Sequence, residues 1–237
     1  MNRWLPIAAV AGAFAAHAAD PQEAWEQAVK AKGGHDRLHR VHSLAIYMKP
    51  AQVNLAGPPT NWLCVFPGRY FEFEGHPMSQ HATVVDEPAD RVATDVTGEP
   101  RGSRRLTPAE HDRLALNQIV FLLESAWLQP RPVEVRRNVL VVEAAGRTYR
   151  LFLNGAGLPE RIVSPPVPGQ KPKIQYEYKL QRYRDFQGVM LPARVASAGR
   201  LHEWTWDVDY EIDAKYNPKL FERTPNLADG PEPWRMR

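Results

Sequence analysis

Three histidines lie close together in the sequence and could form a metal site. His35, His39 and His42 are separated by four and three residues, so a continuous helix would place them along one side. Two histidines one turn apart bind zinc in metalloproteases. However, this segment is expected to form one helical turn before a strand, and Asp36 is its only neighbouring acid. Solvated or capping histidines are the favoured interpretation, so no metal or other cofactor is predicted.

Two pairs of acidic residues could provide acid–base chemistry. Glu72 and Glu74 alternate with phenylalanines in one segment, and Asp207 and Asp209 follow tryptophans in another. Two carboxylates on one face of a strand could act as a general acid and a general base. Alternation of solvent-facing polar residues with core-facing apolar residues explains both pairs without chemistry. We therefore expect these four carboxylates on the solvent side of their strands.

The chain has no recognisable nucleophile motif. None of its serines lies in a nucleophile elbow, and no glycine-rich phosphate loop is present. Cys64, its only cysteine, lies in the apolar residues 62–66, where it is expected to pack in a buried strand as a small apolar side chain. The sequence therefore does not indicate an enzyme, and a metal-dependent hydrolase is kept only as a third alternative.

The elements that position these residues are mostly strands. Apolar and aromatic residues alternate with polar ones through the last quarter of the chain, which is typical of antiparallel strands. The alternating sets are Ile174, Tyr176, Tyr178 and Leu180, and Trp204, Trp206, Val208, Tyr210 and Ile212. With proline and glycine turns as boundaries, strands are predicted over residues 43–49, 60–66, 69–75, 79–86, 91–97, 133–144, 147–153, 158–163, 173–186, 189–198 and 201–213.

Two longer helices accompany the strands. Asp20 can cap a helix over residues 21–32, which Gly33 and Gly34 would end. Thr107 and Glu110 form a capping box that predicts a second helix, to about residue 129. This second helix is apolar around more than half of its circumference, so it should be buried. The order of elements favours an α+β fold, with a curved antiparallel sheet wrapped around one or two helices.

The first 18 residues have the features of a signal peptide. Arg3 precedes an apolar run over residues 5–14, and Ala16 and Ala18 provide small residues for cleavage. Removal would leave a single domain over residues 19–237 that is periplasmic or secreted. The apolar run is too short to cross a bilayer, so no transmembrane segment is predicted in the mature chain. The net charge of +3 comes from scattered residues and gives no support for nucleic-acid binding.

Motifs near both ends of the mature chain point to a known family. Lys32-Gly33-Gly34 ends the first helix, and residues 41–44 (Val-His-Ser-Leu) enter the first strand. Residues 183–192 (YRDFQGVMLP) and 216–221 (YNPKLF) lie around the last strands. This layout resembles the LolA/LolB-like superfamily of exported lipoprotein carriers. The resemblance implies an incomplete, half-open antiparallel β-barrel with helices over its open side. It also implies an apolar cavity, which receives acyl chains in the best-known members.

Aromatic and apolar side chains are the predicted lining of such a cavity. Residues 60–66 and 147–153 carry apolar side chains on both strand faces, so each strand needs a second apolar partner besides a helix. Mouths of β-barrels are common ligand sites. The predicted lining consists of Trp62, Phe66, Phe71, Phe73, Ile119, Leu123, Trp127, Tyr176, Tyr178, Trp204 and Trp206.

The function predicted from these features is non-catalytic binding or carriage of a lipid, an acyl chain or another hydrophobic molecule. The alternative is an envelope accessory protein that binds another protein through a sheet edge or an aromatic face. The proline-rich residues 164–172 could guard the cavity or touch a partner, but a solvated connection is the favoured interpretation.

Overall fold

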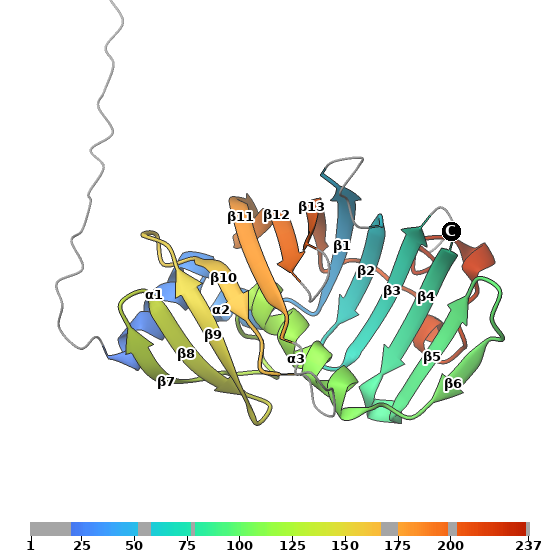
Figure 1. Ribbon diagram of the computed structural model, residues 1–237, viewed down its shortest axis with the longest axis horizontal. Helices are drawn as coiled ribbons and strands as arrows, with labels where there is room; N and C mark the ends of the chain where they lie inside the picture. The colour runs from blue at the N-terminus through green and yellow to red at the C-terminus, as the bar shows by residue number, and fades with distance from the viewer. Residues whose placement is uncertain (1–19, 52–57, 77–78, 167–174, 199–202, 236–237) are drawn as a thin grey trace, which may run out of the picture.

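The structure is a computed structural model that describes residues 20–51, 58–76, 79–166, 175–198 and 203–235 (Figure 1). Within these ranges the chain forms one antiparallel sheet of thirteen strands. The strands are β1 (Ser43–Pro50), β2 (Thr60–Val65), β3 (Arg69–His76), β4 (Ser79–Asp86), β5 (Arg91–Val96), β6 (Gly102–Arg104), β7 (Arg131–Arg136), β8 (Val139–Ala144), β9 (Arg147–Leu153), β10 (Pro159–Val163), β11 (Glu177–Phe186), β12 (Val189–Ala198) and β13 (Glu203–Ile212).

The predicted strands lie close to the observed ones, with two exceptions. The single strand predicted over residues 133–144 is a hairpin, because Arg137 adopts a positive φ of 55° and the chain turns there between β7 and β8. The short edge strand β6 was not predicted. The predicted signal peptide, Ile174 and residues 167–172 of the proline-rich segment lie outside the described residues.

The path of the chain brings the first and last strands together at the centre of the sheet. Strands β1 to β6 follow one another outward to one edge, and β7 to β13 return from the other edge. β1 then pairs with β13, with Ile46 opposite Tyr210. The edge strands β6 and β7 lie at opposite ends of the molecule (Figure 1), so the sheet is not closed. The coarse prediction of a large, open antiparallel sheet is therefore confirmed.

Three α-helices accompany the sheet in the described part of the chain: α1 (Pro21–Lys32), α2 (His35–His39) and α3 (Pro108–Leu122). None of these helices is long and apolar enough to cross a membrane. The predicted cap of α1 is present, with the Gln22 N–H donating to Asp20 at 3.0 Å. After α1, Gly33 has a φ of 139°, and a Cβ there would lie 2.4 Å from the Gly188 carbonyl oxygen. Only glycine fits this approach of α1 to the β11–β12 turn.

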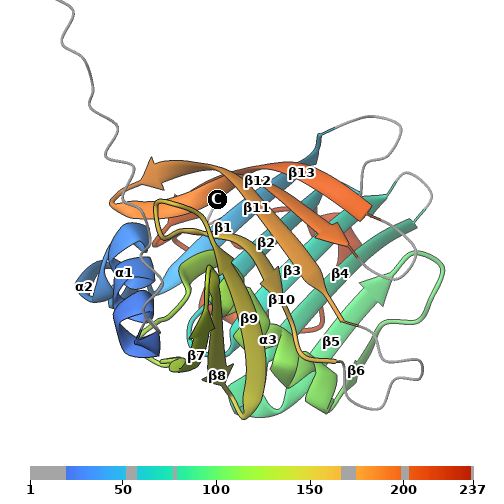
Figure 2. The same cartoon turned by 60° about the vertical axis from the view of Figure 1, so that its left-hand side comes forward.

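Helix α3 begins with the predicted capping box but ends earlier than predicted. Its last residue is Leu122 and not a residue near position 129. Leu123 has a φ of 69°, and the Ser125 hydroxyl then accepts hydrogen bonds from the N–H groups of Trp127 and Leu128. These local bonds offer the backbone an alternative to helix. Figure 2 shows α3 between the two halves of the sheet.

The two faces of the sheet are covered by different parts of the chain. On the face that carries α3, called the inner face below, Phe121 packs edge-to-face on Trp62 and Tyr210. On the outer face, Phe71 and Phe73 belong to a second buried cluster that includes Trp234. The C-terminal segment covers this outer cluster and contains the 3₁₀ turns η2 (Pro218–Phe221) and η3 (Leu227–Asp229). A further turn, η1 (Glu87–Ala89), joins β4 to β5.

Candidate functional site

A cavity of about 340 Å³ lies on the inner face, between the sheet and the N-terminal part of α3. Its walls come from strands of both halves of the sheet and from the helix. The lining residues are Met48, Thr60, Trp62, Glu72, Glu74, Ala109, Glu110, Asp112, Arg113, Leu116, Phe121, Tyr149, Ser164, Pro165, Tyr176, Tyr178, Val195, Ser197, Trp204 and Trp206. Strands far apart in sequence thus converge on one hollow.

Aromatic side chains form much of the lining and mark where the cavity opens. Trp62 is 7% exposed and Trp206 is 7% exposed, so both belong to the inner wall. The Trp206 indole N–H donates to the Pro58 carbonyl oxygen at 3.0 Å, which fixes the orientation of its ring. Trp204 and Tyr176 are 38% and 39% exposed, and therefore lie where the cavity meets solvent.

One wall of the cavity is polar and centres on Glu72. The Arg113 guanidinium lies 2.7 Å from Glu72 Oε1, and the Trp62 indole N–H donates to the same oxygen at 2.8 Å. Glu72 is only 1% exposed, whereas the Arg113 side chain is 41% accessible and lines the cavity. Although burial opposes it, the charge of Glu72 raises the pKa of Arg113 above its ordinary value. The Arg113 guanidinium therefore stays charged at neutral pH.

Two further polar groups face the cavity without an ion pair or hydrogen bond among the described residues. Burial, together with the charge of Glu72, raises the pKa of Glu74 to about 7. Tyr149 is fully buried, and its hydroxyl has no hydrogen-bond partner in the described part of the chain. Burial raises the pKa of Tyr149 to about 12, so this hydroxyl keeps its proton. Glu74 and Tyr149 are thus available to a polar group of a ligand.

Replacing Glu74 with glutamine is expected to remove a pH dependence of stability. The pKa of Glu74 rises from 4.5 to about 7 on folding, so the native state holds more protons than the unfolded state between these values. Stability should then fall as pH rises from about 4.5 to 7, by on the order of 2 kcal/mol. Urea unfolding of wild type and Glu74→Gln at pH 4.5, 6 and 8 measures this. Equal pH profiles for the two proteins would contradict the shift.

The orientation of β3 corrects the prediction for its acidic and aromatic residues. Glu72 and Glu74 face the cavity instead of solvent, whereas Phe71 and Phe73 face the outer cluster and do not line the cavity. The predicted alternation of side chains along β3 is present. Both faces of this strand are covered by other parts of the chain, so the polarity of its residues does not indicate which face lies toward the cavity. Asp207 and Asp209 are exposed, as predicted.

The structure brings five of the predicted lining residues together around the cavity: Trp62, Tyr176, Tyr178, Trp204 and Trp206. Phe66, Ile119 and Leu123 are buried in the inner-face core away from the lining. Trp127 is 45% exposed and packs on the His42 ring, because α3 ends before this position.

Arg113 lines the cavity but is not among the residues predicted from the sequence, although its sequence context indicates a special role. It is an arginine beside the apolar residues 114–116 in a helix predicted to be buried, and a charge in such a helix needs a partner. The partner, Glu72, lies 41 positions away in the chain and could not be identified from spacing.

The candidate reactive groups fall into two kinds. Cys64 is buried, and burial raises the pKa of its thiol to about 12, so it remains a protonated, inert side chain as predicted. His35 and His39 lie beside Glu124, whereas the His42 ring packs on Trp127 instead. The three predicted histidines therefore do not form one set.

No model of a known protein family matches the chain, and no curated protein matches it either. Solved structures do match. The chain resembles a LolA superfamily protein. That protein, from Nitrosomonas europaea, has 12% identity and a TM-score of 0.49, with 86% of this chain and 98% of the other covered.

Two other crystal structures also match, at lower scores. A DUF1329 family protein from Desulfovibrio piger has 9% identity and a TM-score of 0.36, covering 86% of this chain and 98% of its own. LprF from Mycobacterium bovis has 10% identity and a TM-score of 0.31, covering 86% and 97%. The likeness predicted from the sequence is therefore found among solved structures, but at these scores it carries no argument about function.

Proposed function

We propose that this protein binds a lipid, an acyl chain or another hydrophobic small molecule without converting it chemically. The observation that carries the proposal is the cavity of about 340 Å³ with its aromatic wall and exposed rim. Small-molecule sites commonly measure about 300 to 1,000 Å³ and combine apolar walls with a few polar groups. Each methylene removed from water in such a site would contribute about 0.8 kcal/mol.

The polar wall favours an amphipathic ligand. Glu110 and Asp112 also line the cavity, but they pair with Arg104 and Arg147, which do not line it, so their charges are neutralised. Glu74 and the Tyr149 hydroxyl remain for a hydrogen-bonding head group. In this proposal the open sheet and α3 act as a half-barrel that encloses one apolar chain, while its polar end contacts these two residues.

Binding without catalysis is favoured by the state of the two carboxylates. Two neighbouring carboxyl groups in a cavity are a pattern found in acid–base catalysts. Glu72, however, is 1% exposed, and its Oε1 already accepts hydrogen bonds from both Arg113 and Trp62. We therefore assign Glu72 to holding the wall in place and not to chemistry.

Carriage in the periplasm is the cellular part of the proposal. It is supported by the signal-peptide features of residues 1–18. Binding of another envelope protein through a sheet edge is less favoured, because both edges are of the kind that resists pairing. Strand β6 has only three residues, all exposed, and β7 carries Pro132 directly after the exposed Arg131.

A tryptophan placed in the cavity mouth is expected to weaken binding strongly. Ser197 lines the cavity opposite Trp204 on the neighbouring strand, so Ser197→Trp adds a ring where the ligand would enter. The uncharged dye N-phenyl-1-naphthylamine, titrated by fluorescence and displaced with dodecanol, serves as the probe. We expect affinity to fall at least tenfold, which corresponds to about 1.4 kcal/mol.

Thr205→Trp is the matched control, because Thr205 lies between two cavity tryptophans on β13 but on the other face of the sheet. It should bind the dye within twofold of wild type. Equal losses in the two variants, or no saturable binding by wild type, would argue against a ligand in this cavity.

A further inference from the structure

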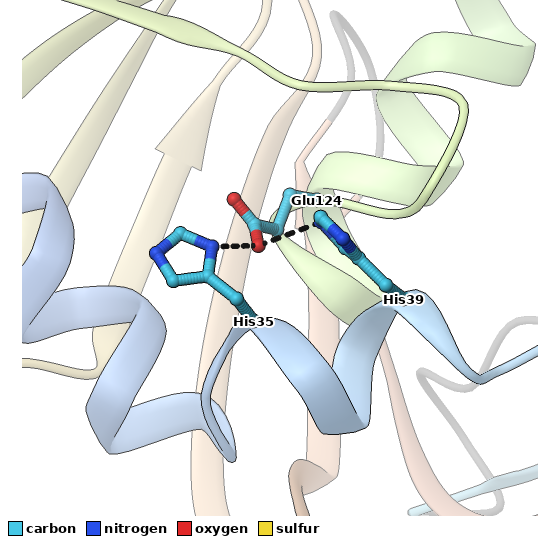
Figure 3. Close-up of side chains that lie close together, drawn as sticks. All are labelled: His35, His39 and Glu124. Atoms are coloured by element: carbon cyan, nitrogen blue, oxygen red, sulfur yellow. Dashed lines mark hydrogen bonds and ion pairs between the residues drawn. The ribbon is translucent and has the colours of Figure 1, made fainter.

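Two histidines and a glutamate from distant parts of the chain meet at the C-terminal end of α3 (Figure 3). His35 and His39 lie one turn apart on α2, and Glu124 follows the residue that caps α3. His35 Nδ1 lies 2.6 Å from Glu124 Oε1, and His39 Nε2 lies 3.0 Å from the same oxygen. One ligand atom from each of the three side chains falls within 4.8 Å of the other two.

A second carboxylate holds the His35 ring from its other side. His35 Nε2 lies 2.6 Å from Glu26 Oε2 on α1. Metal-binding histidines usually donate their second ring N–H to a carboxylate or carbonyl group, which fixes the tautomer and the ring orientation. With Nε2 donating to Glu26, the lone pair of Nδ1 points toward Glu124 and His39. The outer partner that a metal-binding histidine needs is therefore already in place.

The exposure of the three side chains suits an ion reached from solvent. The Glu124 side chain is 3% exposed, whereas the side chains of His35 and His39 are 45% and 30% exposed. The Nε2 atom of His39 is itself buried, and despite its distance of 3.0 Å it does not make a well-aligned hydrogen bond to Glu124. This nitrogen thus faces the centre of the cluster without a hydrogen-bond partner among the described residues.

The backbone before Glu124 has an unusual conformation. Leu123 is fully buried and has φ and ψ of 69° and −52°, a region that non-glycine residues rarely adopt. Such conformations persist where the surrounding structure over-determines them. Here the turn ends α3 and directs the Glu124 side chain toward α2 (Figure 3).

We propose that His35, His39 and Glu124 bind one divalent transition-metal ion, with zinc as the ion that best suits two imidazoles and a carboxylate. Three protein ligands leave a fourth position for solvent, which the exposure of the histidines permits. Donor atoms around a tetrahedral zinc ion are about 3.3 Å apart, given bonds of about 2.0 Å. Glu124 Oε1 lies 2.6 and 3.0 Å from the two imidazole nitrogens, so each of these two distances must lengthen by less than about 1 Å.

The site is separate from the proposed ligand cavity. Cavity residues of α3 such as Glu110 and Arg113 lie toward its N-terminal half, whereas Glu124 lies beyond its C-terminal end. An ion there would join α2 to the end of α3, with Glu26 of α1 in the outer shell. Its effect on the fold would be a clamp between the helices, independent of whether the cavity holds a ligand.

Without a metal, a protonated His35 can make the same contacts by donating from both ring nitrogens to Glu26 and Glu124. Zinc titration of the full chain distinguishes the two states. The protein is prepared without a polyhistidine tag, stripped with a chelator and titrated with Zn²⁺ by calorimetry. We expect one ion per chain, a raised Tm with zinc, and a tetrahedral absorption spectrum with Co²⁺.

Variants assign the ion to the cluster. His39→Ala and Glu124→Gln should each weaken Zn²⁺ binding at least a hundredfold, and Glu26→Gln at least tenfold through the outer shell. His42→Ala is the matched control, since His42 is three residues from His39 and packs on Trp127; it should bind within twofold of wild type. Circular dichroism confirms that each variant is folded.

The absence of stoichiometric zinc binding by wild type would overturn the proposal in favour of the protonated histidine. An equal loss of Zn²⁺ affinity in His39→Ala and His42→Ala would also overturn it, because zinc would then bind to surface histidines in general and not to this cluster. Neither result bears on dye binding in the cavity.

Discussion

Replacement of Arg113 by methionine is expected to lower the free energy of unfolding by about 2 to 3 kcal/mol at pH 8. The change leaves Glu72 as a buried, uncompensated charge, because the side chain of Glu72 is 2% exposed and Arg113 is its ion-pair partner. Loss of one partner from a fully buried pair costs about 3 to 5 kcal/mol. The lower value is expected here because the Arg113 side chain is 41% accessible from the cavity.

The loss should be smaller at pH 5 than at pH 8. Burial and the charge of Glu72 raise the pKa of Glu74, and Arg113 opposes them, so removal of the arginine raises this pKa further and a proton on Glu74 can relieve the charge repulsion. A carboxyl group whose pKa is raised on folding contributes stability at low pH that is lost as pH rises through the folded-state value. Urea unfolding of wild type and Arg113→Met at both pH values measures the difference.

The double variant Glu72→Gln/Arg113→Met provides the control. It removes both charges, and glutamine can still accept the Trp62 indole hydrogen bond, so it should recover more than half of the lost stability. If the double variant is as unstable as Arg113→Met at pH 8, the loss comes from packing. The contacts of the Arg113 guanidinium with the rings of Trp62 and Tyr70 would then be responsible.

The sequence predicted local structure well because local structure depends on neighbouring residues. Asp20 and Gly33 delimit α1 as expected, and the capping box of Thr107 and Glu110 starts α3. The parity of Trp204 and Trp206 placed both rings on one face of β13, and both line the cavity. These features are read from caps, turns and side-chain alternation, which act over a few residues.

The parts that could not be predicted depend on contacts between distant segments. The face of β3 that carries Phe71 became the outer face because Trp234 packs on it, at a ring distance of 5.4 Å. No residue near β3 in the sequence indicates that the C-terminal segment packs on this face. Glu124 meets His35 across 89 positions, and only the irregular end of α3 at Leu123 brings them together. Alternation and spacing therefore locate faces and turns but not their partners.

Replacement of Lys32 by methionine is expected to raise the free energy of unfolding by about 3 kcal/mol at pH 7. Lys32 is fully buried at the end of α1, and its Nζ atom has no hydrogen-bond partner among the described residues. Its cation lies 5.0 Å from the centre of the Tyr183 ring. Burial lowers the pKa of Lys32 from 10.5 to about 7, because the folded protein disfavours the charged form of this side chain.

Methionine keeps the apolar stem of Lys32 and removes this cost, so the stabilisation should depend on pH. Between pH 7 and 10.5 the unfolded chain binds a proton at Lys32 that the native chain does not, and wild-type stability therefore rises with pH in this window. The advantage of Lys32→Met should accordingly shrink as pH rises from 7 to 9.5. Thermal and urea unfolding at both pH values test this.

Lys30→Met, on the exposed side of the same helical turn, should change stability by less than about 0.5 kcal/mol. A neutral or destabilising effect of Lys32→Met at pH 7 would contradict the prediction. It would mean that the charge of Lys32 stabilises the packing of α1 against the sheet.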